Sequence, residues 1–133
     1  MIFEDYFYVY YSETDAGGVV YHTKYIEFCE KCRTDFLRKL EFNQSELLKD
    51  YNIGFVVSSI NANFKMSAKL DDYLKVTIDA IENISCKLIF HQSIFNQNND
   101  LLFKAEIVVV TIDNNHKLYR KIPEYILNKM LNN

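Results

Sequence analysis

The sequence predicts one α+β domain in which an antiparallel sheet folds around a single long helix. Apolar residues recur at three- and four-residue spacing from Thr23 to Leu40, which indicates an amphipathic helix of about five turns. After Gly54 the pattern is that of successive strands almost to the end of the chain. Strands and helices do not alternate, and the sequence contains neither a GxGxxG nor a Walker motif, which argues against a doubly wound nucleotide-binding fold.

The first expected element is a strand from Phe3 to Tyr11, where aromatic and β-branched residues are dense. Both of its faces are apolar, with Tyr6, Tyr8 and Tyr10 on one side and Phe7, Val9 and Tyr11 on the other. The long helix follows, and its apolar stripe consists of Tyr25, Phe28, Cys29, Cys32, Phe36 and Leu40. A short second helix is expected from Gln44 to Asp50, with Asn43 as its N-cap.

The remaining strands are predicted from alternation and from turn residues. One strand with a solvated face has Leu74, Val76, Ile78 and Ala80 alternating with Lys75, Thr77 and Asp79. The next contains Leu88, Phe90 and Ile94, and a turn at Gln97 to Asp100 leads into a returning strand that contains Leu101, Phe103, Ala105, Ile107 and Val109. Val108 and Val110 make that strand apolar on both faces, so a second layer or a second subunit is expected to cover it. Pro123 suits the first position of a short terminal helix whose Ile126, Leu127, Met130 and Leu131 dock onto the sheet.

Length and composition fit one packed domain spanning residues 1–133, with 49% hydrophobic and 25% charged residues. A net charge of -3 and scattered lysines and arginines argue against nucleic-acid binding. The first five residues include Glu4 and Asp5 where a signal peptide would be basic, and the longest apolar run, Ile107 to Val110, is too short for membrane insertion. We therefore expect a cytoplasmic protein whose three cysteines are thiols.

The segment from Thr14 to His22 is the first candidate functional site, because it places Asp15 and a glycine pair directly before the long helix. A helix N-terminus carries unpaired N–H groups and partial positive charge, which stabilise negative charge developing on a substrate oxygen. Gly17 and Gly18 are two of only three glycines in the chain, and they allow close approach of a ligand to the backbone. Spacing alone leaves Asp15 equally consistent with a turn or cap carboxylate.

Other candidate motifs are weaker. Cys29 and Cys32 have the spacing of half a metal site, but both fall on the apolar stripe of the helix and no second ligand pair completes a zinc site. No metal is therefore expected. The chain has no Gly-x-Ser-x-Gly elbow, so hydrolysis would rest on a carboxylate acting as nucleophile or as general base. Glu13 is expected to be a solvated or hydrogen-bonded loop carboxylate.

Tyr10 to Tyr25 closely resembles the active-site segment of the hotdog-fold acyl-CoA thioesterases of the YbgC and 4-hydroxybenzoyl-CoA type. The resemblance continues through Glu30 to Thr34, and it resumes at Gly54 to Val57, at Phe64 to Leu74 and at Ala105 to Val110. It therefore covers nearly the whole chain. One departure is Ser67-Ala68-Lys69, where the family often has Pro-Ala-Arg.

The resemblance implies a hotdog fold paired into homodimers and commonly homotetramers, with the pocket between subunits. It also implies hydrolysis of acyl-CoA. The sequence does not distinguish CoA from acyl carrier protein as the carrier, and no cofactor is expected. Asp15 matches the catalytic carboxylate of the family, and the amide of His22 matches the oxyanion donor. Gly17, Gly18 and Tyr21 are expected to contact substrate. Lys65 and Lys69 either meet the CoA phosphates or, as exposed lysines usually do, only solvate the surface.

Relatives of the YbgC type are associated with the Tol-Pal envelope system and phospholipid synthesis, which suggests a role in lipid metabolism. The main alternative is a non-catalytic protein that binds acyl thioesters or serves as a scaffold in envelope lipid metabolism. A hotdog dehydratase ranks last, because those enzymes use a different histidine and acidic motif, which this chain lacks.

Overall fold

The computed structural model describes residues 1–132 as one five-stranded antiparallel sheet with three α-helices and one 3-10 turn. The sheet order is β1-β3-β4-β5-β2. The elements in chain order are β1 (Phe3–Tyr8), η1 (Tyr11–Glu13), α1 (His22–Lys39), α2 (Gln44–Tyr51), β2 (Gly54–Phe64), β3 (Tyr73–Ile84), β4 (Lys87–Phe95), β5 (Leu101–Ile112) and α3 (Glu124–Leu131).

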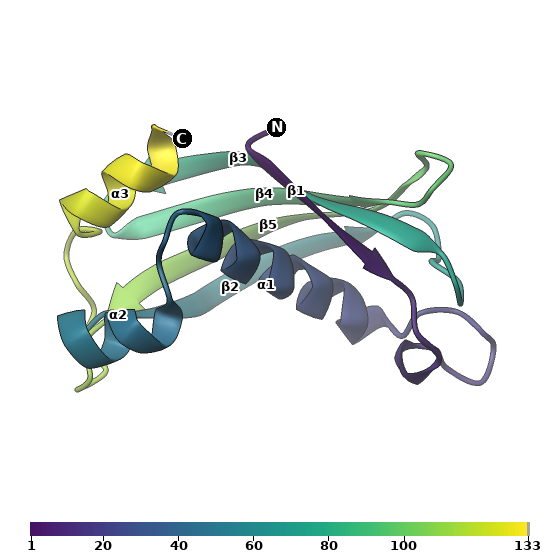
Figure 1. The fold of residues 1–133 in the computed structure, drawn as a ribbon, viewed down its shortest axis with the longest axis horizontal. Coiled ribbons are helices and arrows are strands. Elements are labelled where there is room, and N and C mark those ends of the chain that lie inside the picture. Colours follow the sequence, from purple (N-terminus) through teal and green to yellow (C-terminus); the bar gives the residue numbers. More distant parts are fainter. Residues whose placement is uncertain (133) are drawn as a thin grey trace.

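The curved sheet wraps around α1, which crosses one of its faces (Figure 1). The helix stripe and the inward side chains of the three central strands form the core, which includes Phe28, Cys29, Cys32, Phe36, Leu74, Val76, Ile78, Leu88, Phe90, Ile94, Phe103 and Ile107. This is the α+β arrangement that the sequence predicts. Within residues 1–132, every helix is too short or too polar to cross a bilayer.

The two predicted internal helices are confirmed to within a residue at each end. α1 begins at His22 and ends at Lys39. α2 runs from Gln44 to Tyr51, and the Asn43 side chain caps it by accepting hydrogen bonds from the amides of Ser45 and Glu46 at 3.0 and 3.4 Å. Cys29 and Cys32 are buried free thiols, as the stripe predicts, and burial raises the pKa of Cys29 to about 12.

The first strand is shorter than predicted. It ends at Tyr8, and Tyr11 lies in a 3-10 turn instead of a strand. The reason is local, because the Glu13 carboxylate accepts a hydrogen bond from the Tyr10 amide at 2.8 Å and the Thr14 hydroxyl donates to the Tyr11 carbonyl at 2.7 Å. These side chains offer the backbone a turn in place of the sheet ladder.

The strand with a predicted solvated face departs from simple alternation at Asp79. The pairing register with β4 shifts between Ile78 and Ala80, so Asp79 is an extra residue and Ala80 moves to the exposed face. Thr77 is buried although we expected it to be solvated, because its hydroxyl donates to Asp79 at 2.7 Å and the Ser93 hydroxyl donates to the other carboxylate oxygen at 2.6 Å.

The last strands and the terminal helix follow the prediction with smaller changes. The β4–β5 hairpin is confirmed. In the single chain Val110 is buried and Val108 is half-buried. α3 begins one residue after Pro123. It docks through the buried Ile126 and Met130 and the partly buried Leu127, whereas Leu131 is exposed and does not dock.

A buried polar network crosses the core and was not predicted. The Arg33 guanidinium donates to the Gln92 side-chain oxygen at 2.9 Å, and the Gln92 amide group donates to the Cys29 carbonyl at 3.2 Å. Gln92 is fully buried and burial lowers the pKa of Arg33. The network ties α1 to β4 across the middle of the domain.

Replacing Gln92 with leucine is expected to lower the free energy of unfolding by about 2–4 kcal/mol, because the buried Arg33 guanidinium loses its acceptor. Urea denaturation monitored by circular dichroism measures this change. The double replacement Gln92→Leu with Arg33→Met removes both partners and is expected to be less destabilising than Gln92→Leu alone. A Gln92→Leu protein as stable as the wild type would contradict a role for this network.

Candidate active site

The Thr14 to His22 segment forms a tight loop between η1 and α1. The Asp15 amide donates to the Val19 carbonyl at 2.9 Å, and the Gly18 amide donates to the Asp15 carbonyl at 3.1 Å. Thr14 and Val20 form an isolated antiparallel bridge at the base of the loop. These contacts fix the position of Asp15 relative to the start of α1.

The Asp15 carboxylate is held by its own loop and faces solvent. Its Oδ1 accepts a hydrogen bond from the Gly17 amide at 2.8 Å, which is the turn role that spacing alone leaves open. Within residues 1–132, Oδ2 has no recorded hydrogen bond. The carboxylate is therefore oriented through one oxygen and available through the other.

The two glycines serve different purposes. Gly18 has φ +80°, a conformation that residues with a Cβ rarely adopt. A Cβ on Gly17 would lie 3.3 Å from Asp15 Oδ1, closer than ordinary van der Waals contact. Gly18 thus closes the turn, and Gly17 leaves room for the carboxylate.

The start of α1 lacks a side-chain cap. Tyr21 occupies the N-cap position, and within the described part of the chain its side chain makes no capping hydrogen bond. The first turn contains no acidic residue. The Tyr21 amide donates to the Glu13 carbonyl at 3.0 Å, but the His22 amide has no acceptor among the described residues. A free N–H at a positive helix end can donate to a developing oxyanion.

A second segment, from Phe64 to Asp72, lies against this loop. The Val20 amide donates to the Ala68 carbonyl at 2.9 Å, and Val19 and Lys69 form a bridge. The Tyr25 hydroxyl accepts from the Ala68 amide at 2.9 Å. The structure therefore brings Lys69 to the glycine turn, whereas Lys65 lies just beyond the end of β2.

The His22 ring belongs to an aromatic cluster. Its centre lies 4.4 Å from the Tyr21 ring and 6.5 Å from the Phe64 ring, and Phe64 in turn contacts Tyr25 and Phe103. Tyr21 is exposed beside it. The His22 ring thus packs at the start of the helix. The unused hydrogen-bond donor of this residue is its backbone amide.

The site is open in a single chain. Asp15, Gly17, Gly18, Tyr21 and His22 are all exposed. The edge strand β2 also exposes a row of apolar side chains, with Val57 at 41%, Ile60 at 39% and Phe64 at 50% of their full surface. Enclosing a substrate at Asp15 therefore requires a second surface.

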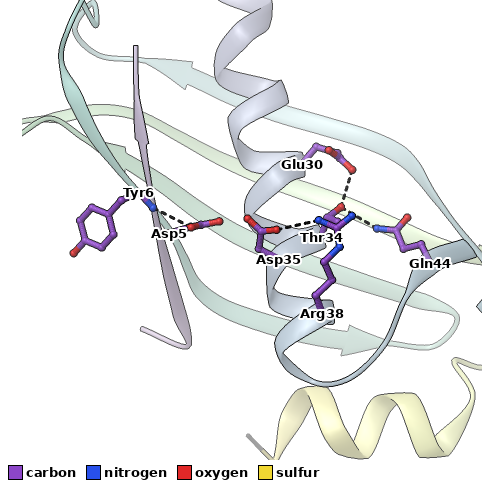
Figure 2. Close-up of polar contacts among 7 residues, drawn as sticks. All are labelled: Asp5, Tyr6, Glu30, Thr34, Asp35, Arg38 and Gln44. Carbon is purple, nitrogen blue, oxygen red and sulfur yellow. Dashed lines mark hydrogen bonds and ion pairs between the residues drawn. The ribbon is translucent and has the colours of Figure 1, made fainter. Parts of the chain in front are cut away.

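A partly open cavity of about 90 Å³ lies farther along α1, and none of the Thr14 to His22 residues lines it. It has an apolar side that includes Phe55, Phe90 and Met130. Its polar side includes Glu30, Thr34 and Gln44, which Figure 2 shows linked to one another. Thr34 donates to Glu30 at 2.8 Å and accepts from Gln44 at 2.9 Å. Sequence reasoning did not identify this cavity, because its walls come from helices and strands far apart in the chain.

Comparison with known proteins identifies the family to which this chain belongs. The model of the thioesterase-like superfamily matches residues 9–130. The chain is 41% identical over 105 residues to the acyl-CoA thioesterase YbgC of Haemophilus influenzae, covering 79% of this chain and 76% of that protein. It is 39% identical over 119 residues to the acyl-CoA thioester hydrolase YbgC of Escherichia coli, covering 90% and 88%.

A solved structure confirms the fold. The 1,4-dihydroxy-2-naphthoyl-CoA thioesterase from Synechocystis superposes with a TM-score of 0.87 at 20% identity, covering 96% of this chain and 94% of that one. The chain therefore belongs to the thioesterase-like superfamily, and its sheet wrapped around a long helix is the hotdog fold of these thioester hydrolases.

Proposed function

We propose that the protein hydrolyses acyl-CoA thioesters to a free acid and CoA, with Asp15 and the His22 amide as its catalytic groups. The observation that carries this proposal is an exposed, oriented carboxylate next to a helix start whose amide lacks an acceptor in the described chain. The sequence relatives at about 40% identity, which are acyl-CoA thioesterases by name, support the same chemistry.

Two routes use these groups. In the first, Asp15 Oδ2 attacks the thioester carbon, the His22 amide donates to the carbonyl oxygen as it becomes negative, and the CoA thiolate leaves and takes up a proton. Water then cleaves the resulting anhydride, which restores the carboxylate and releases the acid. In the second, Asp15 removes a proton from the attacking water, and the same amide stabilises the tetrahedral intermediate.

The neighbouring residues are assigned to substrate binding. Gly17 and Gly18 let the thioester approach the backbone, and Tyr21 flanks the helix start. Lys69 bridges to the glycine loop through its backbone, and we assign its ammonium group to a CoA phosphate. We assign Lys65 the same role from the end of β2. The carrier is CoA or acyl carrier protein.

We propose that a second copy of the chain closes the site. β2 is an edge strand, and its exposed Val57, Ile60 and Phe64 offer an apolar surface next to the aromatic cluster of the helix start. A homodimer through this surface, assembling further into a homotetramer, would cover it. Sedimentation equilibrium measures the assembly, and a monomer at catalytic concentrations would contradict the proposal.

We further propose a cytoplasmic role in lipid metabolism, associated with the Tol-Pal system. A second candidate function is non-catalytic binding of acyl thioesters. The hydrogen bond from the Gly17 amide to Asp15 Oδ1 favours this second function, because the bond gives the carboxylate a structural role that requires no hydrolysis.

A thiol-release screen separates the two functions. The purified protein is incubated with short, long and aromatic acyl-CoAs in the presence of a thiol reagent, and binding is measured in parallel by calorimetry. Repeated turnover on at least one acyl class is the expected result. Tight binding without thiol release on every class would overturn hydrolysis and favour the binding protein.

A further inference from the structure

A carboxyl group interrupts the aromatic packing between β1 and α1. Phe3 and Phe7 of β1 point toward the helix, and their rings lie 5.6 Å from those of Phe36 and Phe28 respectively. Asp5 occupies the position between them on the same face of the strand. An apolar residue would suit this position better, so the carboxyl group requires an explanation.

The two oxygens of Asp5 differ in their surroundings. Oδ1 accepts a hydrogen bond from the Tyr6 amide at 3.0 Å. Oδ2 is buried and has no hydrogen-bond partner among the described residues. Figure 2 shows that the Asp35 carboxyl of α1 points toward Asp5 from the facing helix. Two acceptors facing each other make no hydrogen bond unless one of them carries a proton.

The surrounding charges do not neutralise Asp5. On α1, Arg38 lies 3.4 Å from Asp35, and Lys39 lies over the Phe3 ring at 5.6 Å, but within residues 1–132 neither forms an ion pair with Asp5. The Cys32 thiol donates to the Val76 carbonyl at 3.5 Å. The facing residue on β3 is the apolar Val76, and Lys75 beside it lies on the other face of the strand. On β1, Glu4 lies on the solvent side.

Burial first, then the facing Asp35 carboxyl and its negative charge, raise the pKa of Asp5 from 3.8 to about 6, while the hydrogen bond from the Tyr6 amide lowers it. A raised pKa in the folded state means that folding favours the protonated form. The stabilising contribution is complete below pH 3.8 and is lost as the pH rises to about 6. Most paired carboxylates have the opposite pH dependence.

We propose that Asp5 and Asp35 share one proton taken from solvent and act as a pH-dependent clamp between β1 and α1. Among residues 1–132, β1 is an edge strand that pairs only with β3, so packing against α1 is its second attachment. β1 leads into the catalytic segment and α1 follows it. The clamp therefore holds both ends of the Tyr10 to Tyr21 segment most firmly in acid. At neutral pH its loss weakens the attachment of β1 to α1, while the aromatic packing and the pairing with β3 remain.

Asp5→Asn tests the clamp, because the amide keeps the shape of the acid. Its oxygen can still accept from the Tyr6 amide, and its NH2 group donates to Asp35 at every pH. The Tm of the variant and of the wild type is measured at pH 4.5 and pH 7.5 at fixed protein concentration. We expect similar Tm values at pH 4.5 and a variant that is more stable by about 4 °C at pH 7.5.

Two further variants keep the test decisive. Asp35→Asn places the hydrogen-bond donor on α1 instead of β1. It is expected to produce the same difference in Tm from the wild type, present at pH 7.5 and absent at pH 4.5. Glu4→Gln removes a carboxylate from the solvent face of β1 and is expected to produce no pH-dependent difference in Tm. A Tm difference between Asp5→Asn and the wild type that is the same at both pH values would overturn the clamp, whatever the absolute stability of the variant.

Discussion

Replacing Asp15 with asparagine is expected to lower kcat for acyl-CoA hydrolysis by roughly 100- to 10,000-fold, because the variant has neither a nucleophilic oxygen anion nor a base. The amide oxygen can still accept from the Gly17 amide, so the loop keeps its shape. KM is expected to change by less than about threefold, since the lost interaction acts in the transition state. Steady-state thiol release at several acyl-CoA concentrations measures both constants.

Glu13→Gln is the matched control, because it changes a neighbouring carboxylate in the same way. Glu13 accepts from the Tyr10 amide at 2.8 Å, and a glutamine oxygen can replace that contact. We expect this variant to keep kcat close to that of the wild type. If Asp15→Asn also kept wild-type kcat with an unchanged circular dichroism spectrum, both proposed routes would be wrong.

Gly17→Ala is expected to lower kcat by roughly 10- to 100-fold with little loss of stability. The new Cβ would lie 3.3 Å from Asp15 Oδ1, so the carboxylate must shift by some tenths of an ångström or lose its hydrogen bond to the residue 17 amide. Small displacements of a catalytic group have large effects on rate. Activity and Tm are measured on the same preparation, so that a folding defect is distinguished from a catalytic one.

Gly54→Ala is the control for loss of a glycine elsewhere. A Cβ at Gly54 would meet its nearest neighbours, on Ile112 and Leu48, at an ordinary 3.5 Å. This variant is expected to retain the wild-type rate. Equal kcat values for Gly17→Ala and the wild type would show that the position of the Asp15 carboxylate does not limit hydrolysis.

Much of the fold was predictable because its signals are local. The stripe from Tyr25 to Phe36 has one period and no competing pattern, and Asn43 is a strong cap that the structure uses as expected. The β4–β5 hairpin follows from its turn residues. In each case, residues close together in the chain supply both the preference for the helix or turn and the contacts that stabilise it.

Features that depend on distant partners were not predictable. The register shift at Asp79 arises from pairing with β4, and the burial of Thr77 accompanies its contacts with Asp79 and with Ser93 of β4. In the sequence, Arg33 is simply a charged residue near the apolar stripe. Its hydrogen-bond acceptor, Gln92, lies 59 residues further along the chain. The premature end of β1 is different, because its cause is local: the side chains of Glu13 and Thr14 outweigh a strong strand pattern.

The candidate site was predictable as a segment but not as a geometry. The position of Asp15 and the glycine pair before the long helix indicated this segment, and the resemblance gave Asp15 and the His22 amide their catalytic roles. The structure adds that Gly17 orients the carboxylate, that Lys69 lies at the glycine turn and Lys65 does not, and that the His22 ring packs among aromatic residues. These details depend on the fold of the loop and on the Phe64 to Asp72 segment beside it.

A crystal structure of the Asp15→Asn protein with an intact acyl-CoA tests whether Asp15 and the His22 amide are the catalytic groups. We expect the thioester carbonyl oxygen to accept a hydrogen bond from the His22 amide at roughly 2.7–3.1 Å, with the side chain at position 15 next to the carbonyl carbon. An acyl-CoA whose thioester lies elsewhere, with the start of α1 unoccupied, would contradict it.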